Sequence, residues 1–276
     1  MADERAESVG KITRVECTTT AADRPFTLEV FHSWSPLGVE RFLELVRDDF
    51  FTDVALFRCV ENFLCQFGIQ PDPNSEKKKY WQSQGAIKDD PTLGIPFKRG
   101  TLSFAGGGED SRTTQLFITN ADISFLGSPK APWETPLGVV TEGMDTVVDK
   151  FYKGYRDQKP FNKDGVNQGI LQMRGNEYLR EEFPLLTLFK KCKVVGEVAE
   201  ELYTDHRIET DSVRVYGDSM LAPPRGQPKD RLQEQTLTGS LAAGGVPTWY
   251  FVLSAFVLGV VLWVWKNNKK EQRLKH

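Results

Sequence analysis

The fold of this chain is decided by the stretch Leu56-Phe57-Arg58-Cys59-Val60-Glu61-Asn62-Phe63-Leu64-Cys65-Gln66-Phe67-Gly68. It spans most of two short runs of mainly apolar and aromatic residues, 55–60 and 63–69. Side chains of this kind suit the pleated, half-buried surface of a sheet, so each run predicts a β-strand. We therefore expect a mainly β fold in which these two strands lie close together.

Further short strands are expected on both sides of this stretch. Residues 11–31 alternate apolar and polar positions around a turn at 22–25, which predicts a β-hairpin. Other strands are expected at 101–105, 115–120 and 186–195, and a polar loop at 70–97.

Only two helices are expected in this part of the chain. One begins at Ser35 or Pro36, because the apolar residues that follow recur at a spacing near 3.6, and the other covers 144–152. Many short strands with two helices predict an antiparallel sheet that closes into a barrel and is capped by those helices.

The C-terminal part of the chain predicts a membrane anchor. From Trp249 to Trp265 the sequence is apolar, and no charged residue lies between Glu234 and Lys266. At about 1.5 Å per residue, a helix over 247–265 nearly crosses a hydrocarbon layer of roughly 30 Å. A buried core helix is the alternative, but only the short basic tail 266–276 follows it. We therefore predict a domain at 10–198, a flexible linker at 199–246 and a transmembrane helix at 247–265.

The side of the membrane is predicted from the N-terminus and the cysteines. Residues 1–8 lack the apolar region of a secretory signal, and the four cysteines show no paired spacing. Both features favour a domain that faces the cytosol, whereas the basic tail favours the opposite orientation. The organelle stays open between a mitochondrial or plastid outer membrane, a peroxisome and the endoplasmic reticulum.

Composition argues against several functional classes. With 35 Lys and Arg against 38 Asp and Glu, the chain has no basic excess for nucleic acid. The one basic cluster ahead of the anchor, 77–79, is interpreted as a solvated loop. The three histidines are far apart in the sequence, and no metal-ligand cluster, phosphate loop or nucleophile with an evident base occurs. We expect neither a metal nor a cofactor.

The stretch quoted first resembles the active-site strands of the cyclophilins, whose signature reads Phe-His-Arg-x-x-x-x-Phe-x-x-Gln-x-Gly. The segments 100–105, 111–119 and 137–144 resemble further cyclophilin segments in the same order. The resemblance covers about residues 10–196, and 168–186 looks like the extended segment of a longer form.

The resemblance implies an eight-stranded, closed antiparallel barrel and peptidyl-prolyl cis-trans isomerase activity on proline-containing segments of client proteins. Rotation about an X-Pro bond has a barrier of about 20 kcal/mol and requires no covalent chemistry. The resemblance assigns catalysis to Arg58, which donates hydrogen bonds to the twisted amide, and to Gln66. It assigns substrate binding to Phe63, Leu64, Ala105, Gly106, Gln115, Phe117, Phe125 and Leu126.

Several positions depart from the family pattern. Phe57 replaces the usual histidine, Gly106 the usual asparagine and Phe125 the usual tryptophan, while Glu134 or Trp133 aligns with a histidine of the proline pocket. A second hypothesis is therefore a proline-binding module without useful turnover, such as an accessory subunit of a membrane complex. A third is a purely structural role, because an arginine on a strand is often only a surface ion pair.

Overall fold

The computed structural model of the chain describes residues 10–127 and 131–200. These residues belong to the first of two compact units, Met1–Leu221. The predicted transmembrane helix, the tail and nearly all of the predicted linker lie outside the described residues. Within the described ranges, no helix combines the length and the apolar character needed to cross a membrane.

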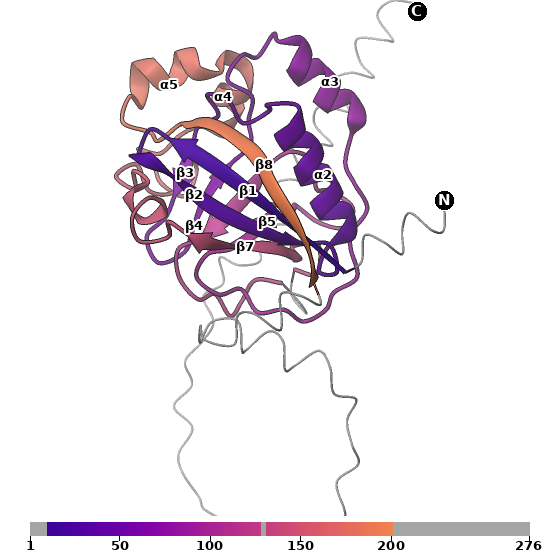
Figure 1. Ribbon diagram of the computed structural model, residues 1–276. Coiled ribbons are helices and arrows are strands. Elements are labelled where there is room, and N and C mark those ends of the chain that lie inside the picture. The colour runs from indigo at the N-terminus through magenta and orange to yellow at the C-terminus, as the bar shows by residue number, and fades with distance from the viewer. Residues whose placement is uncertain (1–9, 128–130, 201–276) are drawn as a thin grey trace, which may run out of the picture. The chain divides into compact units, whose positions relative to one another are not determined.

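Eight antiparallel strands form one sheet, which confirms the prediction of a mainly β fold. Figure 1 shows β1, β2 and β8 crossing the front of the domain with α2 beside them. The order across the sheet is β3-β4-β6-β5-β7-β2-β1-β8. The strands are β1 (Lys11–Thr19), β2 (Ala22–Phe31), β3 (Arg58–Cys59), β4 (Leu64–Phe67), β5 (Thr101–Phe104), β6 (Leu116–Thr119), β7 (Pro136–Glu142) and β8 (Phe189–Ala199).

The prediction of a closed barrel is wrong, because no ladder joins β3 to β8 at the two ends of the order. Strand β3 has only two residues and therefore offers almost no edge for pairing. The chain just before β3 meets the start of β8 through one isolated bridge, Ala55 to Leu188. Backbone hydrogen bonds of 2.9 Å from Asp53 to Phe189 and from Leu56 to Thr187 flank that bridge.

The prediction of only two helices is also wrong. Helix α2 (Pro36–Arg47) lies where it was expected, but 144–152 forms turns and a short 3₁₀ helix, η1 (Val148–Lys150). The predicted polar loop contains α3 (Glu76–Gln84), which buries only Trp81 and so lacks an apolar repeat in the sequence. The lysine cluster 77–79 is therefore helical.

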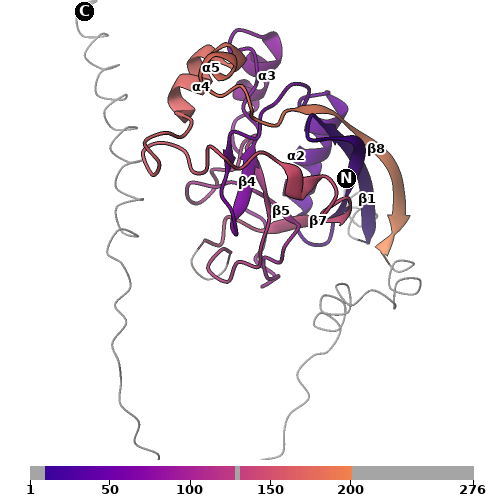
Figure 2. The ribbon, with the colours of Figure 1, turned by 90° about the vertical axis from the view of Figure 1, so that its left-hand side faces the viewer.

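Helices α4 (Gln168–Arg174) and α5 (Asn176–Glu182) lie together at one end of the domain in both views (Figures 1 and 2). They cover a small hydrophobic cluster of their own, separate from the main core between the sheet and α2. Phe57, which stands where the family has a histidine, is 1% exposed and belongs to this cluster. Its ring thus packs inward, next to the strand that carries Arg58.

The cysteines pair, contrary to the prediction from their spacing. Disulfides join Cys17 to Cys192 and Cys59 to Cys65. Each pair stands directly opposite in a strand ladder, β1 with β8 and β3 with β4. Sequence spacing does not reveal such partners, because strand register brings them together only in the folded sheet.

A buried ion pair fixes the start of α2. The Asp90 carboxylate accepts hydrogen bonds of 2.9 Å from the backbone N–H groups of Leu37 and Gly38, and it also accepts one from the Ser35 hydroxyl. Arg112 Nη1 donates to the same carboxylate at 3.0 Å, and both charged side chains are 0% exposed. Asp90 therefore satisfies free N–H groups of the helix and neutralises a buried arginine.

We predict that Asp90→Ala lowers the free energy of unfolding by about 3 to 5 kcal/mol, because it removes the buried carboxylate of the Arg112 ion pair and leaves this buried charge only the longer contact of 3.4 Å with Asp89. Chemical denaturation of the full chain measures the change. The control is Glu76→Ala, which breaks a pair with Lys79 in which the side chains are 61% and 89% exposed. The control should cost less than about 1 kcal/mol. Equal effects of the two substitutions would contradict the prediction.

Candidate active site

The register of three strands places one row of polar and aromatic side chains on the outer face of the sheet. Arg58 of β3 stands opposite Gln66 of β4, and Gln66 stands opposite Phe117 of β6. Neighbouring residues of a strand point to opposite faces, so Cys65 and Phe67 enter the main core instead. The alternation separates the side chains of this row from those that build the core.

The side chains of this row are joined by hydrogen bonds. Arg58 Nη1 donates to Gln66 Oε1 at 3.1 Å, and Gln66 Nε2 donates to Gln115 Oε1 at 2.9 Å. The guanidinium carbon of Arg58 lies 5.5 Å from the centroid of the Phe63 ring, within the range of a cation–π contact. The two residues predicted to be catalytic therefore contact each other and two of the predicted binding residues.

The loop between β3 and β4 is held by one asparagine. The backbone N–H of Phe63 donates to Asn120 Oδ1 at 2.7 Å, and Asn120 Nδ2 donates to the carbonyl of Val60 at 2.9 Å. Asn62, between them, has a positive φ of 56°, which asparagine tolerates better than most residues. These contacts fix the position of Phe63 beside Arg58.

An apolar cluster adjoins the guanidinium group. Leu64 and Phe117 form part of its buried centre, and Phe63, Ala105 and Leu126 pack against it. The cluster also contains Phe97 and Ile123, which the sequence prediction missed; Phe97 stacks on Phe117 with centroids 5.8 Å apart. Phe125 is 41% exposed and lies against Phe63, with ring centroids 5.5 Å apart.

Gly106 lies beneath the indole of Trp133. A Cβ atom at position 106 would come within 2.4 Å of Trp133 Cδ1, so the indole fills the space that a side chain there would need. The preceding residue, Ala105, donates its backbone N–H to the Gln115 carbonyl at 2.9 Å. The glycine found where the family has an asparagine thus accompanies an aromatic ring from the segment 131–136.

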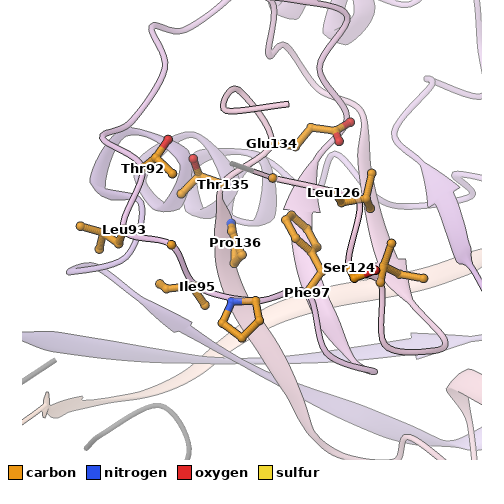
Figure 3. Close-up of a pocket in the computed structure, with 13 residues that line it drawn as sticks. Thr92, Leu93, Ile95, Phe97, Ser124, Leu126, Glu134, Thr135 and Pro136 are labelled. Atoms are coloured by element: carbon orange, nitrogen blue, oxygen red, sulfur yellow. The ribbon is translucent and has the colours of Figure 1, made fainter. Parts of the chain in front are cut away.

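A cavity of about 270 Å³ lies beside the apolar cluster, with walls from 92–97, 123–124, 126–127 and 134–136. It shares Leu126 and Phe97 with the cluster. Figure 3 shows Glu134 and Leu126 at one end of this cavity and Leu93 and Ile95 at the other. The cavity therefore adjoins the apolar cluster that contains the residues predicted to hold the proline ring.

Glu134 is the one carboxyl group of the cavity wall with a strongly shifted pKa. Burial raises this pKa to about 7 from an ordinary value of 4.5, against smaller opposing effects of a hydrogen bond from the Gly106 N–H and of the Arg58 charge. Near neutral pH the group is therefore only partly ionised.

No group of three or more His, Cys, Asp or Glu suited to hold a metal ion occurs among the residues that the structure describes. The side chains around Arg58 are instead hydrogen-bond donors, acceptors and apolar surfaces.

The structure brings all ten predicted site residues into this one region, although their individual roles stay predictions. Sequence reasoning missed Asp157, whose Oδ1 lies 2.7 Å from Arg58 Nε. The two residues are 99 positions apart, and no motif links them. Only the fold reveals this pair.

Comparison with known proteins identifies the family. Residues 14–168 match the family model described as cyclophilin type peptidyl-prolyl cis-trans isomerase/CLD, which is more than half of the chain. The chain belongs to the cyclophilins. It is therefore assigned to the peptidyl-prolyl cis-trans isomerases, as the sequence predicted.

Two relatives found by sequence comparison carry the name of the same activity. A peptidyl-prolyl cis-trans isomerase of Acinetobacter baylyi is 31% identical to this cyclophilin over 140 residues, which cover 50% of the chain and 71% of the relative. A Neurospora crassa peptidyl-prolyl cis-trans isomerase-like 2 is 30% identical over 151 residues, which cover 53% of the chain but only 24% of that protein. A solved cyclophilin-type isomerase of Cryptosporidium parvum is 16% identical, with a TM-score of 0.46, and the match covers 67% of this chain and 98% of that one.

We predict that the wild-type cyclophilin loses stability relative to Glu134→Gln as the pH rises from about 4.5 to 7. Because the folded-state pKa is raised, the native protein holds this proton longer than the unfolded chain does. The stabilisation is complete below the unfolded pKa and is lost as the pH passes through the folded pKa. The relative loss should be about 1 to 3 kcal/mol, measured by denaturant unfolding at pH 4, 6 and 8.

Glu109→Gln, at an exposed glutamate, is the control and should show no such trend. A parallel course of wild type and Glu134→Gln would contradict the raised pKa.

Proposed function

We propose that this cyclophilin isomerises X-Pro bonds by binding the twisted amide between Arg58 and the apolar cluster. The observation that supports the proposal is the contact between a charged donor and an apolar pocket. The guanidinium lies 5.5 Å from the Phe63 ring, and that ring packs against the cluster that contains Leu64 and Phe117. A proline ring is apolar, whereas its amide nitrogen gains electron density when conjugation is lost, so both surfaces are required.

The proposed mechanism is preferential binding of the transition state. Catalysis requires that the twisted amide be bound more tightly than either planar form, and about 1.4 kcal/mol of such preference gives a tenfold rate increase. A planar amide nitrogen is a poor acceptor because its lone pair is delocalised. Rotation localises the lone pair, and an N–H of Arg58 can then donate to it. This hydrogen bond stabilises only the twisted state, as preferential binding of the transition state requires.

The remaining residues of the site are proposed to orient the peptide. The Gln66 and Gln115 side chains, linked at 2.9 Å, offer amide groups to the backbone that precedes the proline. Trp133 over Gly106 adds an aromatic surface on the same side. Phe63, Leu126 and Phe117 hold the proline ring.

We predict that Arg58→Ala lowers kcat/KM for a proline tetrapeptide by about 100-fold, the usual effect of removing a donor that stabilises developing charge. A protease-coupled or NMR exchange assay on the full chain in mild detergent measures it. Arg24→Ala, at an exposed arginine, is the matched control and should leave kcat/KM unchanged.

The alternative hypotheses make different predictions in the same assay. Wild-type protein that binds the tetrapeptide without accelerating its isomerisation would select the binding module. Absence of both binding and acceleration would select a structural role. Unchanged kcat/KM in Arg58→Ala would reject the arginine mechanism while leaving the isomerase intact.

We propose further that the domain works beside a lipid membrane, held by the apolar run Trp249–Trp265. A coil of about 45 residues between domain and anchor has a root-mean-square reach of roughly 35 to 40 Å. In this proposal, the domain would bind proline-containing segments of client proteins, including those of a membrane complex, within that range. The disulfides Cys17–Cys192 and Cys59–Cys65 favour an oxidising compartment, which is evidence against the cytosolic orientation expected from the sequence.

We predict that residues 241–276 suffice to bring a fluorescent protein to a membrane. Leu258→Arg in the same fusion is the control, because a charge at the centre of the span costs about 3 kcal/mol and should leave the fusion soluble. For the full chain in sealed organelles, added protease should digest the domain if it faces the cytosol. Protection of the domain would overturn that orientation, and a diffuse fusion protein would overturn the anchor.

A further inference from the structure

We infer that Asp157 is a positioning residue that holds the Arg58 guanidinium in the orientation needed for substrate. The inference rests on the proposed role of Arg58 in isomerisation. Asp157 lies in the segment between η1 and α4, far from the strands of the site in sequence. Its side chain nevertheless forms the shortest polar contact that Arg58 makes, at 2.7 Å.

The hydrogen bonds of Arg58 to Asp157 and Gln66 use three of its five N–H donors. A guanidinium group has five N–H donors in a rigid plane. Nε donates to Asp157 Oδ1 at 2.7 Å, Nη2 donates to Asp157 Oδ2 at 3.4 Å, and Nη1 donates to Gln66 Oε1 at 3.1 Å. One N–H therefore remains on each terminal nitrogen. Two donors, one on Nη1 and one on Nη2, are left for the carbonyl oxygen and the amide nitrogen of a bound peptide.

The two-point contact with Asp157 determines the plane of the guanidinium group. A single hydrogen bond to Gln66 would allow rotation about the last bonds of the arginine side chain, whereas a carboxylate paired with Nε and Nη2 restrains that rotation. The Phe63 ring supports the same group at 5.5 Å. Arg58 and Asp157 are 18% and 26% exposed, so solvent weakens this pair less than it weakens a surface pair.

The segment that carries Asp157 is itself fixed against β3. The backbone N–H of Cys59, next to Arg58, donates to the carbonyl of Arg156 at 3.3 Å. Arg156 adopts a positive φ of 56°, and a Cβ at Gly165 would come within 1.9 Å of the Asp157 carbonyl oxygen. The Asp157 carboxylate also accepts the Gln158 N–H at 2.8 Å. These constraints hold the carboxylate in place independently of Arg58.

The test is Asp157→Ala in the full chain, with Asp164→Ala as the matched control on the same segment, where the aspartate side chain is 77% exposed. We expect Asp157→Ala to lower kcat by about tenfold or more with a smaller change in KM, because the aligned donors act mainly in the transition state. The control should match wild type. Asp157→Asn, which keeps one acceptor for Nε, should recover part of kcat.

Two readouts separate positioning from a merely structural role. The ¹⁵Nε–¹Hε signal of Arg58 should exchange with water faster in Asp157→Ala than in wild type, while thermal unfolding changes little. In an Arg58→Ala background, Asp157→Ala should have no further effect on kcat, because there is no guanidinium left to orient.

The outcomes distinguish this inference from the proposed function. Inactive wild-type protein, or activity that ignores Arg58→Ala, would reject the proposed function itself. A large effect of Arg58→Ala with no effect of Asp157→Ala on kcat would overturn the positioning role alone. A loss of kcat in Asp157→Ala that persists undiminished in the Arg58→Ala background would also overturn it.

Discussion

The pairing register of β3, β4 and β6 is the constraint on which the rest of the site depends. It sets Arg58 opposite Gln66 and Gln66 opposite Phe117, so donor, amide and pocket wall lie in one row on one face. A slip of one residue would turn Gln66 inward and bring Cys65 and Phe67 to the surface. Since those two side chains belong to the main core, packing of the core opposes the slip. The energy that specifies the site therefore comes largely from residues that never contact a substrate.

The loops supply the side chains of the site that the strands do not. The sheet supplies Arg58, Gln66 and Phe117, but the carboxylate on Arg58 comes from Asp157 and the ring over Gly106 from Trp133. Each loop residue is held by contacts of its own: the Arg156 carbonyl accepts from β3, and Glu134 accepts from the Gly106 N–H. A rigid sheet with separately anchored loops allows the surface around Arg58 to change while the position of Arg58 on β3 is kept.

The sequence predicted those parts of the fold that depend on residues close together in the chain. Alternating side chains predicted the first hairpin, and the resemblance of Arg58, Phe63 and Gln66 to the cyclophilin signature predicted the candidate site. Helix α3 was missed because it buries one residue, Trp81, and its charged remainder looks like a loop. The disulfides, the open edge between β3 and β8, and the Arg58–Asp157 pair depend on strand register and loop path over as many as 175 residues. No local pattern encodes them.

Two carboxyl groups, those of Asp157 and Glu134, determine the net charge around the Arg58 guanidinium. Asp157 contacts Arg58 directly and offsets its charge, so the pair is neutral as a whole. The charge of Arg58 lowers the pKa of Glu134, but burial raises this pKa by more, to about 7. If Glu134 were fully ionised, Arg58, Asp157 and Glu134 together would carry a net negative charge next to the two N–H groups that remain for substrate. A peptide presents carbonyl oxygens to this site, and a negative field would repel them. In the proposed mechanism, a partly protonated Glu134 would therefore preserve the attraction between Arg58 and the amide near neutral pH.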